Sequence, residues 1–400
     1  MFNEYFTMSE EQAIQYAKEK LTIFDENEAL ACKEIGDGNL NYIFKVFSTE
    51  SDRSIIIKQS GPVARISDEF KLSPDRNRIE YEILKYQDEL APGLVPKVYQ
   101  YDPIMNCTVM DDLSDHVIMR TEMINRKQFP KFSQDITDFM VKTLLLTTDV
   151  CLEHKHKKDL VKNFINPELC EISEDLVYTE PFSDNNNRND VFPPNTAWVE
   201  EHLYGDDALK LETAKLKFEF MNNAQSLVHG DLHTGSIFVK EDSTKIIDPE
   251  FAFYGPMGYD VGNVIANLIF TWANADAYGD AVHKAWVEKT IVEVVDLFRE
   301  KFLTTWAEKA TEYTANYKGF NEAYLESVLK DTSAVTGLES IRRTVGLAHV
   351  KDITMIEDAE KRARAERMVM MAGKRFIMER GAFLTGADFL NVIKGVESQF

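Results

Sequence analysis

Residues 227–250, LVHGDLHTGSIFVKEDSTKIIDPE, carry the strongest structural signal in this chain. Two apolar, β-like segments at residues 227–239 and 245–247 flank a polar turn at residues 240–244. Charged residues stand at the ends of these segments, in a region whose pattern is otherwise mostly helical. Functional groups tend to lie on short segments of this kind, because a scaffold fixes their positions. The sequence therefore predicts the functional site in this stretch.

His229, Asp231 and His233 occupy alternate positions directly after the apolar Leu227 and Val228. In an extended backbone, alternate side chains face the same side of the strand. Three interpretations remain open for this segment. It could be a solvated turn, a metal site in which the histidines and Asp231 are ligands, or a phosphotransferase segment in which Asp231 orients a substrate hydroxyl and accepts its proton.

Asp248 and Glu250 follow the apolar residues 246–247 and stand two positions apart, which in extended geometry again places both on one side. Paired carboxylates suit a hard cation, and Mg²⁺ prefers one or two of them together with nucleotide phosphates. A lone Asp-x-Glu is common and is mostly an exposed turn. Its position 17 residues after Asp231 favours the phosphotransferase interpretation.

Lys58 closes the apolar run of residues 55–57, where a charge is costly unless it meets an anion. A lysine on a strand beside phosphates explains this position, and the alternative is a strand end whose lysine reaches solvent. Upstream, residues 36–41 (GDGNLN) predict a hairpin tip whose glycines allow close approach of the backbone to a nucleotide. Glu80, on the helix expected next, could pair with Lys58 or remain solvated.

A chain of 400 residues is too long for one compact core, so we expect two lobes. The expected elements of residues 1–112 are helices at residues 10–21 and 76–86 and strands at residues 42–47, 54–58, 95–101 and 107–110. Residues 113–400 are expected to form a larger, mostly helical lobe. The predicted fold class is α+β, with a small sheet-containing lobe followed by a helical one.

The formal charge of −22 produces a negative long-range field that disfavours nucleic acid and anionic membranes as partners. The cysteines are widely spaced, which predicts reduced thiols rather than a disulfide framework. No basic region followed by an apolar one opens the sequence, so we expect a cytoplasmic protein. The apolar residues 261–273 are too few to span a bilayer and predict a buried helix.

Taken in chain order, the glycine hairpin, the strand lysine, the helix glutamate, His-Gly-Asp and Asp-x-Glu resemble the aminoglycoside phosphotransferase and choline kinase branch of the protein-kinase-like fold. Within this branch, the strings EIGDGNLNYIF, HGDLHTGSIF, IDPEFAFYGP and SIRRTVGLAHV resemble the 5-methylthioribose kinase family. The resemblance extends over nearly the whole chain. It implies a two-lobed α+β fold with a nucleotide-binding lobe at residues 1–112 and a catalytic, substrate-binding lobe at residues 113–400.

The resemblance also implies a role for each matching residue. Asp231 would be the catalytic base and would contact the substrate, and Arg342 and Arg343 would face the substrate and the transferred phosphoryl group. The residues implied in binding ATP and Mg²⁺ are Asn41 and Lys58, the adenine-binding hinge Asp111, Asp112 and Leu113, and Asp248, Pro249 and Glu250, of which Asp248 and Glu250 would hold the metal.

The implied reaction is phosphorylation of the C1 hydroxyl of 5-methylthioribose by ATP and Mg²⁺ in methionine salvage, by a homodimer. The alternatives are a kinase for another small alcohol, such as a different sugar, choline or an amino alcohol; a metallohydrolase; and a nucleotide-binding protein without catalysis. The sequence departs from the wider kinase pattern at Ser236, where an asparagine usually binds a second metal, and Glu250 could take its place. The segment 60–72 departs from the family pattern as well.

Overall fold

The computed structural model describes residues 1–25, 27–35, 41–61 and 73–400. Two compact units are present: unit 1 contains Met1–His116 and Lys245–Ala252, and unit 2 contains Val117–Thr244 and Phe253–Phe400. The predicted hairpin tip at residues 36–40 lies outside the described residues, as do residues 62–72 of the segment after Lys58. The chain thus returns to unit 1 for one short segment, which carries Asp248 and Glu250.

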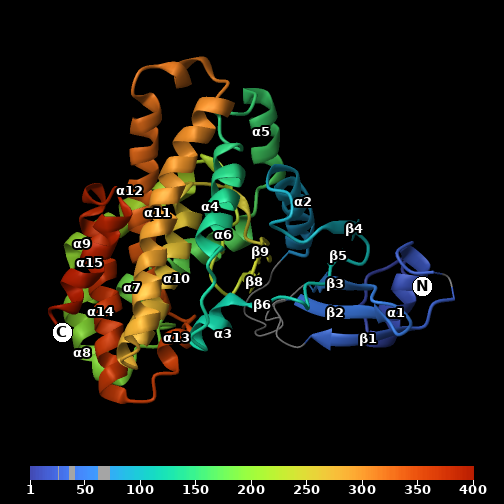
Figure 1. The fold of residues 1–400 in the computed structure, drawn as a ribbon, viewed down its shortest axis with the longest axis horizontal. Coiled ribbons are helices and arrows are strands. Elements are labelled where there is room, and N and C mark those ends of the chain that lie inside the picture. Colours follow the sequence, from blue (N-terminus) through green and yellow to red (C-terminus); the bar gives the residue numbers. More distant parts are fainter. Residues whose placement is uncertain (26, 36–40, 62–72) are drawn as a thin grey trace. The chain divides into compact units, whose positions relative to one another are not determined.

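An antiparallel sheet of five strands, in the order β1-β2-β3-β5-β4, forms the framework of unit 1 (Figure 1). The strands are β1 (Leu30–Ile35), β2 (Asn41–Ser48), β3 (Ser54–Ser60), β4 (Val98–Asp102) and β5 (Cys107–Asp111). In the register of this sheet, Lys58 on β3 lies between Ile43 on β2 and Thr108 on β5. Four of these strands were predicted from the sequence, whereas β1 was not.

The two faces of the sheet differ because successive strand side chains alternate. On one face, Phe44, Val46, Ile55 and Ile57 are buried in a core shared with the helix α1 (Glu10–Lys20). Burial of each such side chain is worth about 1.5–3 kcal/mol. Alternation puts Lys58 on the opposite face, where Ile43, Phe47 and Ile56 are only half-buried.

The helix α2 (Asp75–Leu90) is fixed to the sheet by a buried asparagine. The Asn77 side chain donates to the carbonyl of Lys58 at 3.1 Å and accepts from the Thr108 hydroxyl at 2.8 Å. Buried apolar residues at Ile79 and Ile83 add the usual i, i+4 stripe. Glu80 is therefore held on the helix beside β3.

Unit 2 is built mainly from helices (Figure 1). The described helices of eight or more residues are α4 (Phe132–Met140), α5 (His154–Asn163), α6 (Pro167–Leu176), α9 (Asp207–Asn222), α10 (Gly258–Ala277), α11 (Ala281–Lys309), α12 (Phe320–Val345), α14 (Ala359–Met378) and α15 (Gly386–Glu397). The expected buried helix at residues 261–273 is the centre of α10, which is buried along almost its whole length. The sheet of unit 1 and the helices of unit 2 together confirm the predicted α+β fold class.

Close packing fixes the position of α12, which ends at the predicted arginine pair. A Cβ atom at Gly262 of α10 would lie 2.8 Å from the carbonyl oxygen of Thr332 on α12. One at Gly337 of α12 would lie 2.3 Å from the carbonyl oxygen of Gly373 on α14. Only glycine permits such approach, so α12 is tightly held between its neighbours.

Short strands surround the segment that was predicted to hold the site. The strand β7 (Ser226–Val228) pairs with β10 (Phe253–Gly255), and β8 (Ile237–Lys240) lies between β6 (Val117–Ile118) and β9 (Ser243–Ile246). The predicted β segment at residues 227–239 is thus two strands separated by a loop at residues 229–236. None of the described helices is long and apolar enough to cross a membrane.

Candidate active site

Lys58 is the centre of a buried charged cluster in unit 1. Its ammonium group lies 2.8 Å from Glu80 Oε1 and is also ion-paired with Asp248 Oδ1. Only 6% of Lys58 is exposed. Burial alone would lower the pKa of this lysine, but the charges of Asp248, Glu80 and Glu250 raise it instead. Lys58 therefore carries a positive charge, and the pairing with Glu80 considered from the sequence is present.

Glu250 is held by polar partners on two other elements. Its Oε2 atom accepts from Asn41 Nδ2 at 3.1 Å and lies 3.3 Å from Arg76 Nε. The side-chain oxygen of Asn41, Oδ1, in turn accepts from Ser60 Oγ at 2.8 Å and from Arg76 Nη2 at 3.2 Å. Asn41, predicted to contact the nucleotide, thus uses its amide to orient Glu250.

The backbone at Asp248 contradicts the extended geometry assumed from the sequence. The strand β9 ends at Ile246, and Asp248 has a φ of +66°, in the left-handed region that few residues other than glycine adopt. Strain of this kind is common at functional sites. The bend turns the Asp248 carboxylate toward Lys58 while 42% of that side chain stays exposed, whereas Glu250 is buried.

The donor chemistry of this cluster fits Mg²⁺. Its ion pairs among the described residues join the carboxylates Glu80, Asp248 and Glu250 to two cations, Lys58 and Arg76. Burial raises the pKa of Glu80 to about 7, and burial and the Asp248 charge raise that of Glu250, because the nearby cations do not offset the excess negative charge. A divalent cation at Asp248 and Glu250 would supply the missing charge. No group of three or more His, Cys, Asp and Glu side chains that could hold a metal ion by itself occurs among the described residues.

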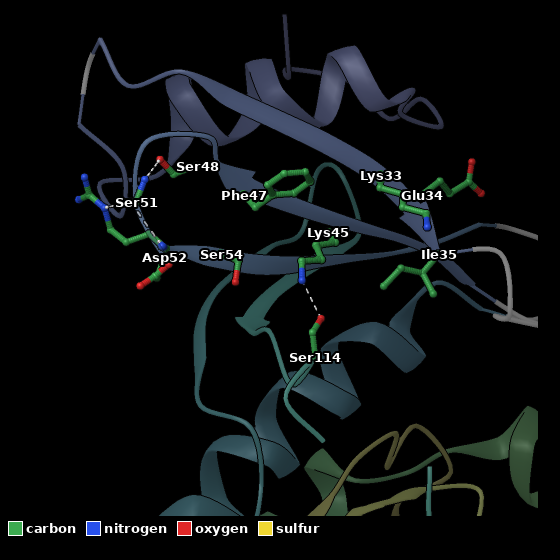
Figure 2. Close-up of a pocket in the computed structure, with 11 residues that line it drawn as sticks. Lys33, Glu34, Ile35, Lys45, Phe47, Ser48, Ser51, Asp52, Ser54 and Ser114 are labelled. Carbon is green, nitrogen blue, oxygen red and sulfur yellow. Dashed lines mark hydrogen bonds between the residues drawn. The ribbon is translucent and has the colours of Figure 1, made fainter. Parts of the chain in front are cut away.

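A concavity of about 680 Å³ opens on the sheet of unit 1 (Figure 2). Ile35, Lys45 and Phe47 line it, and the strand register puts all three on the same face as Lys58. In Figure 2, Lys45 points toward Ser114, with which it forms a 2.7 Å hydrogen bond. Of the described residues that line it, Ile35 and Phe47 are apolar and the others are polar or charged.

The three predicted hinge residues are ordered by contacts within unit 1. The Asp112 carboxylate lies 2.7 Å from Lys45 Nζ and 2.7 Å from Ser54 Oγ, and although burial opposes the change, these partners lower its pKa. Asp111 Oδ2 accepts from the Lys97 amide at 2.9 Å, and the Leu113 carbonyl accepts from the His116 amide at 2.9 Å. The Asp111 and Asp112 side chains are therefore held in place by contacts within unit 1.

In unit 2, the loop at residues 229–236 is held by a buried aspartate from α10. Asp260 Oδ2 accepts from the His229 amide at 2.7 Å, and its Oδ1 accepts from the Gly230 amide at 3.0 Å. Gly230 has a φ of +82°, so the backbone turns here. The predicted alternation of His229, Asp231 and His233 along an extended strand is therefore wrong, since a left-handed residue interrupts it.

Asp231 lies near His233 and both predicted arginines. Its Oδ2 atom is 3.4 Å from His233 Nε2, and its Oδ1 atom is 3.5 Å from Arg343 Nη2 and 3.9 Å from Arg342 Nη2. A quarter of the Asp231 side chain is exposed. The carboxylate thus has loosely held partners on both sides and access to a ligand.

Glu339 explains how two adjacent arginines reach one place. Their side chains start about 100° apart around α12, but Glu339 precedes them by three and four residues and so lies between them on the helix surface. Arg343 Nε donates to Glu339 Oε1 at 3.0 Å, and Arg342 Nε bonds to Oε2. Although burial opposes it, the two arginines lower the pKa of Glu339. Neither arginine is solvated.

Arg120 on α3 (Met119–Ile124) is a third arginine of this cluster, and it was not predicted from the sequence. It donates to Asn267 Oδ1 at 2.9 Å and to Thr234 Oγ1 at 3.3 Å, and it lies 3.8 Å from Asp352. Burial and the nearby Arg343 charge lower its pKa. Because its partners are more than 100 residues away in the chain, only the fold reveals them.

Comparisons with known proteins agree with this architecture. The model of the phosphotransferase enzyme family matches residues 32–289. A choline kinase from Cryptosporidium parvum has a similar fold, with a TM-score of 0.51 and 15% identity over 90% of this chain and 95% of that chain. The match to the family model covers more than half of the chain, so its class is that of the phosphotransferases.

Two relatives that match nearly the whole chain identify its family within the phosphotransferases. A methylthioribose kinase of Bacillus pumilus is 40% identical over 96% of both chains, and one of Geobacillus kaustophilus is 40% identical over 98% of both. The chain belongs to the methylthioribose kinase family within the phosphotransferases. These matches extend beyond residue 289 and so include the arginine pair on α12.

Proposed function

We propose that this protein transfers the γ-phosphoryl group of ATP to the C1 hydroxyl of 5-methylthioribose, giving 5-methylthioribose 1-phosphate and ADP. The observation that carries this proposal is the identity of about 40% to methylthioribose kinases over nearly the full length. The proposed setting is methionine salvage in the cytoplasm, with the enzyme acting as a homodimer. The charged clusters of the two units supply the chemistry that such a transfer requires.

Unit 1 binds the nucleotide in this proposal. Lys58 pairs with the phosphates, which is supported by its buried, positively charged state. Asp248 and Glu250 hold Mg²⁺, with Asn41 orienting Glu250. The metal would neutralise charge on the phosphates as the bond to the leaving oxygen breaks. The adenine ring binds on the sheet face beside Asp111, Asp112 and Leu113, through backbone groups.

Unit 2 binds the acceptor. Asp231 orients the C1 hydroxyl and accepts its proton as the new oxygen–phosphorus bond forms and the bond to the ADP oxygen breaks. Arg342 and Arg343 move from Asp231 to the transferred phosphoryl group, which is supported by their loose separations of 3.9 and 3.5 Å from that carboxylate. Because charge spreads over the equatorial oxygens, these cations contribute more than the basicity of Asp231.

A coupled assay of ADP release tests the proposal. With ATP, Mg²⁺ and 5-methylthioribose, we expect turnover that disappears when the metal is removed with EDTA. A panel of other sugars, choline and amino alcohols should give far lower kcat/KM. No activity with 5-methylthioribose, combined with activity on another alcohol, would reject the substrate and keep the reaction class.

The role of Asp231 is tested by Asp231→Asn. Turnover should fall by about 10²–10⁴, the usual contribution of a positioned general base, with the Kd for ATP unchanged. Asp242→Asn, which changes an exposed acid in the β8–β9 turn, is the matched control and should leave both unchanged. A rate like that of the unchanged enzyme in Asp231→Asn would remove the carboxylate from the mechanism.

A further inference from the structure

His233 is a polar residue of the predicted site to which the proposed chemistry gives no role. It is almost fully enclosed, with 14% of its side chain exposed, and it lies two residues after Asp231. It was considered above only as a metal ligand. Its contacts in unit 2 are inconsistent with that role and indicate another.

The protonation of the His233 ring follows from its backbone partners. Its Nδ1 atom accepts from the Gly235 amide at 3.1 Å and from the Ser236 amide at 3.1 Å. A backbone N–H can only donate, so Nδ1 carries no proton and has no lone pair left for a metal. The ring proton of the neutral imidazole must then be on Nε2, which faces Asp231 Oδ2 at 3.4 Å.

The surroundings also keep the ring neutral. Burial lowers the pKa of His233 well below its usual value, and the neighbouring guanidinium groups of Arg120 and Arg343 lower it further. Glu339 opposes this effect without cancelling it. A hydrogen bond from an uncharged ring stabilises a carboxylate less than one from an imidazolium, so a neutral donor orients Asp231 at a smaller cost to its action as a base.

We infer that His233 is a positioning residue that donates its Nε2–H to Asp231 Oδ2 and so turns Oδ1 toward the acceptor hydroxyl. The loop amides of Gly235 and Ser236 fix the ring, and the ring fixes the carboxylate. The 3.4 Å separation shortens to a hydrogen bond when the acceptor is bound, as catalytic contacts commonly do. Ser236, which stands where the wider kinase pattern has a metal ligand, also places its hydroxyl oxygen 3.2 Å from Nδ1. This inference rests on the proposed role of Asp231 as the base.

Two substitutions separate the two ends of the ring. His233→Asn keeps an acceptor near the position of Nδ1 but has no donor that reaches Asp231. His233→Gln places an amide N–H near the position of Nε2. We expect kcat to fall by up to about 100-fold in His233→Asn, with little change in the KM for ATP, and to recover to within about 3-fold in His233→Gln.

The pH profile distinguishes positioning from proton transfer. Glutamine cannot carry a proton, so His233→Gln should keep the kcat profile of the unchanged enzyme. Loss of activity in His233→Gln equal to that in His233→Asn, or full activity in both variants, would overturn the inference.

A measurement on the unchanged protein does not depend on how the variants fold or which substrate is used. The ¹⁵N chemical shifts of the His233 ring should show an unprotonated Nδ1 and a protonated Nε2 from pH 6 to 8. The signals are assigned by comparison with His233→Gln or, should that variant not fold, by contacts to the Gly235 and Ser236 amides. A proton on Nδ1, or a charged ring, would overturn the inference. If 5-methylthioribose were not the substrate, this tautomer would still be found, so the two failures can be told apart.

Discussion

The charged clusters of the two units have different charge balances. Ion pairs in unit 1 join three carboxylates, Glu80, Asp248 and Glu250, to two cations, Lys58 and Arg76. Those in unit 2 join Asp231, Glu339 and Asp352 to an equal number of arginines, Arg120, Arg342 and Arg343. Counted over the residues that the structure describes, the first cluster has one carboxylate more than it has cations, a balance that a divalent cation would reverse. The second is neutral only while Asp231 stays ionised and near its arginines.

The pKa values of two buried glutamates express the same contrast. In unit 1, burial raises the pKa of Glu80 to about 7, because one lysine shared among several carboxylates does not offset it. In unit 2, burial likewise acts on Glu339, but two arginines overcome it and lower the pKa. A kinase needs both environments: one completed by metal and triphosphate, the other ready to accept a phosphoryl group.

Removing Asp248, the proposed metal ligand, should give the largest effect. Asp248→Asn removes one negative charge from the charged cluster of unit 1. In the metal-free protein this should reduce the repulsion among the carboxylates, and it should abolish tight Mg²⁺ binding. Loss of metal stabilisation worth several kcal/mol corresponds to a fall in kcat of at least about 10³-fold. Steady-state rates over a range of Mg²⁺ concentrations measure it.

The same experiment checks the charge argument through stability. The melting temperature of metal-free Asp248→Asn should be equal to or above that of the unchanged protein. The control Asp242→Asn should change neither kcat nor the melting temperature. A large drop in melting temperature would show that Asp248 is held mainly by Lys58 and that the cluster has no excess negative charge.

The arginine pair gives an intermediate effect. Arg343→Ala should lower kcat by about 10²–10³-fold, the cost of removing one donor to developing charge, and Arg342→Ala should lower it less, because Arg342 is farther from Asp231. Replacement by lysine should restore little activity, since a lysine cannot bridge Glu339 and a phosphoryl group with a planar fork. The double variant should cost less than the sum of the two, because both arginines depend on Glu339.

Lys330→Ala is the control for the arginine variants, since this half-exposed lysine on α12 forms a 2.8 Å ion pair with Glu326 of the same helix. It should keep full activity. Equal losses in Arg342→Ala and Arg343→Ala would mean that the separations from Asp231 do not rank the two side chains.

Local patterns predicted the strands of unit 1 well where apolar residues alternate. For the Ile-rich β3, which follows a clear turn, the predicted ends of the strand lie within two residues of the observed ends. The strand β1 was missed because LACKEI contains a single β-branched residue and lies at the sheet edge, half-exposed, so neither propensity nor burial marks it. The fold class could therefore be predicted without every strand.

The site was predictable in residue type and not in geometry. Asp231 and the Asp248–Glu250 pair were chosen on the assumption of extended backbone, yet Gly230 and Asp248 have positive φ values that break the alternation. The glycine was a visible signal that went unused. Arg120 had none, because its contacts are with residues distant in the chain. Glu339 did have one, because it precedes the arginine pair by three and four residues, the spacing of neighbours on a helix.

The smallest effect, on stability alone, tests the comparison most directly. Because the pKa of Glu80 is raised in the folded, metal-free protein, Glu80 stays protonated where the unfolded chain has lost its proton. Its contribution to stability therefore falls as the pH rises from about 4.5 to about 7, by roughly 1–3 kcal/mol. Urea unfolding in EDTA should show that the free energy of unfolding of Glu80→Gln, relative to that of the unchanged protein, rises by this amount over that pH range. The control is Glu89→Gln, which changes an exposed residue of the same helix.

The pKa of Glu339 is lower in the folded than in the unfolded protein, so its contribution to stability is complete above the unfolded pKa and is lost only in stronger acid. The cost of Glu339→Gln should thus be constant from pH 5 to 7.5, and equal pH dependence in the two variants would contradict the contrast between the clusters.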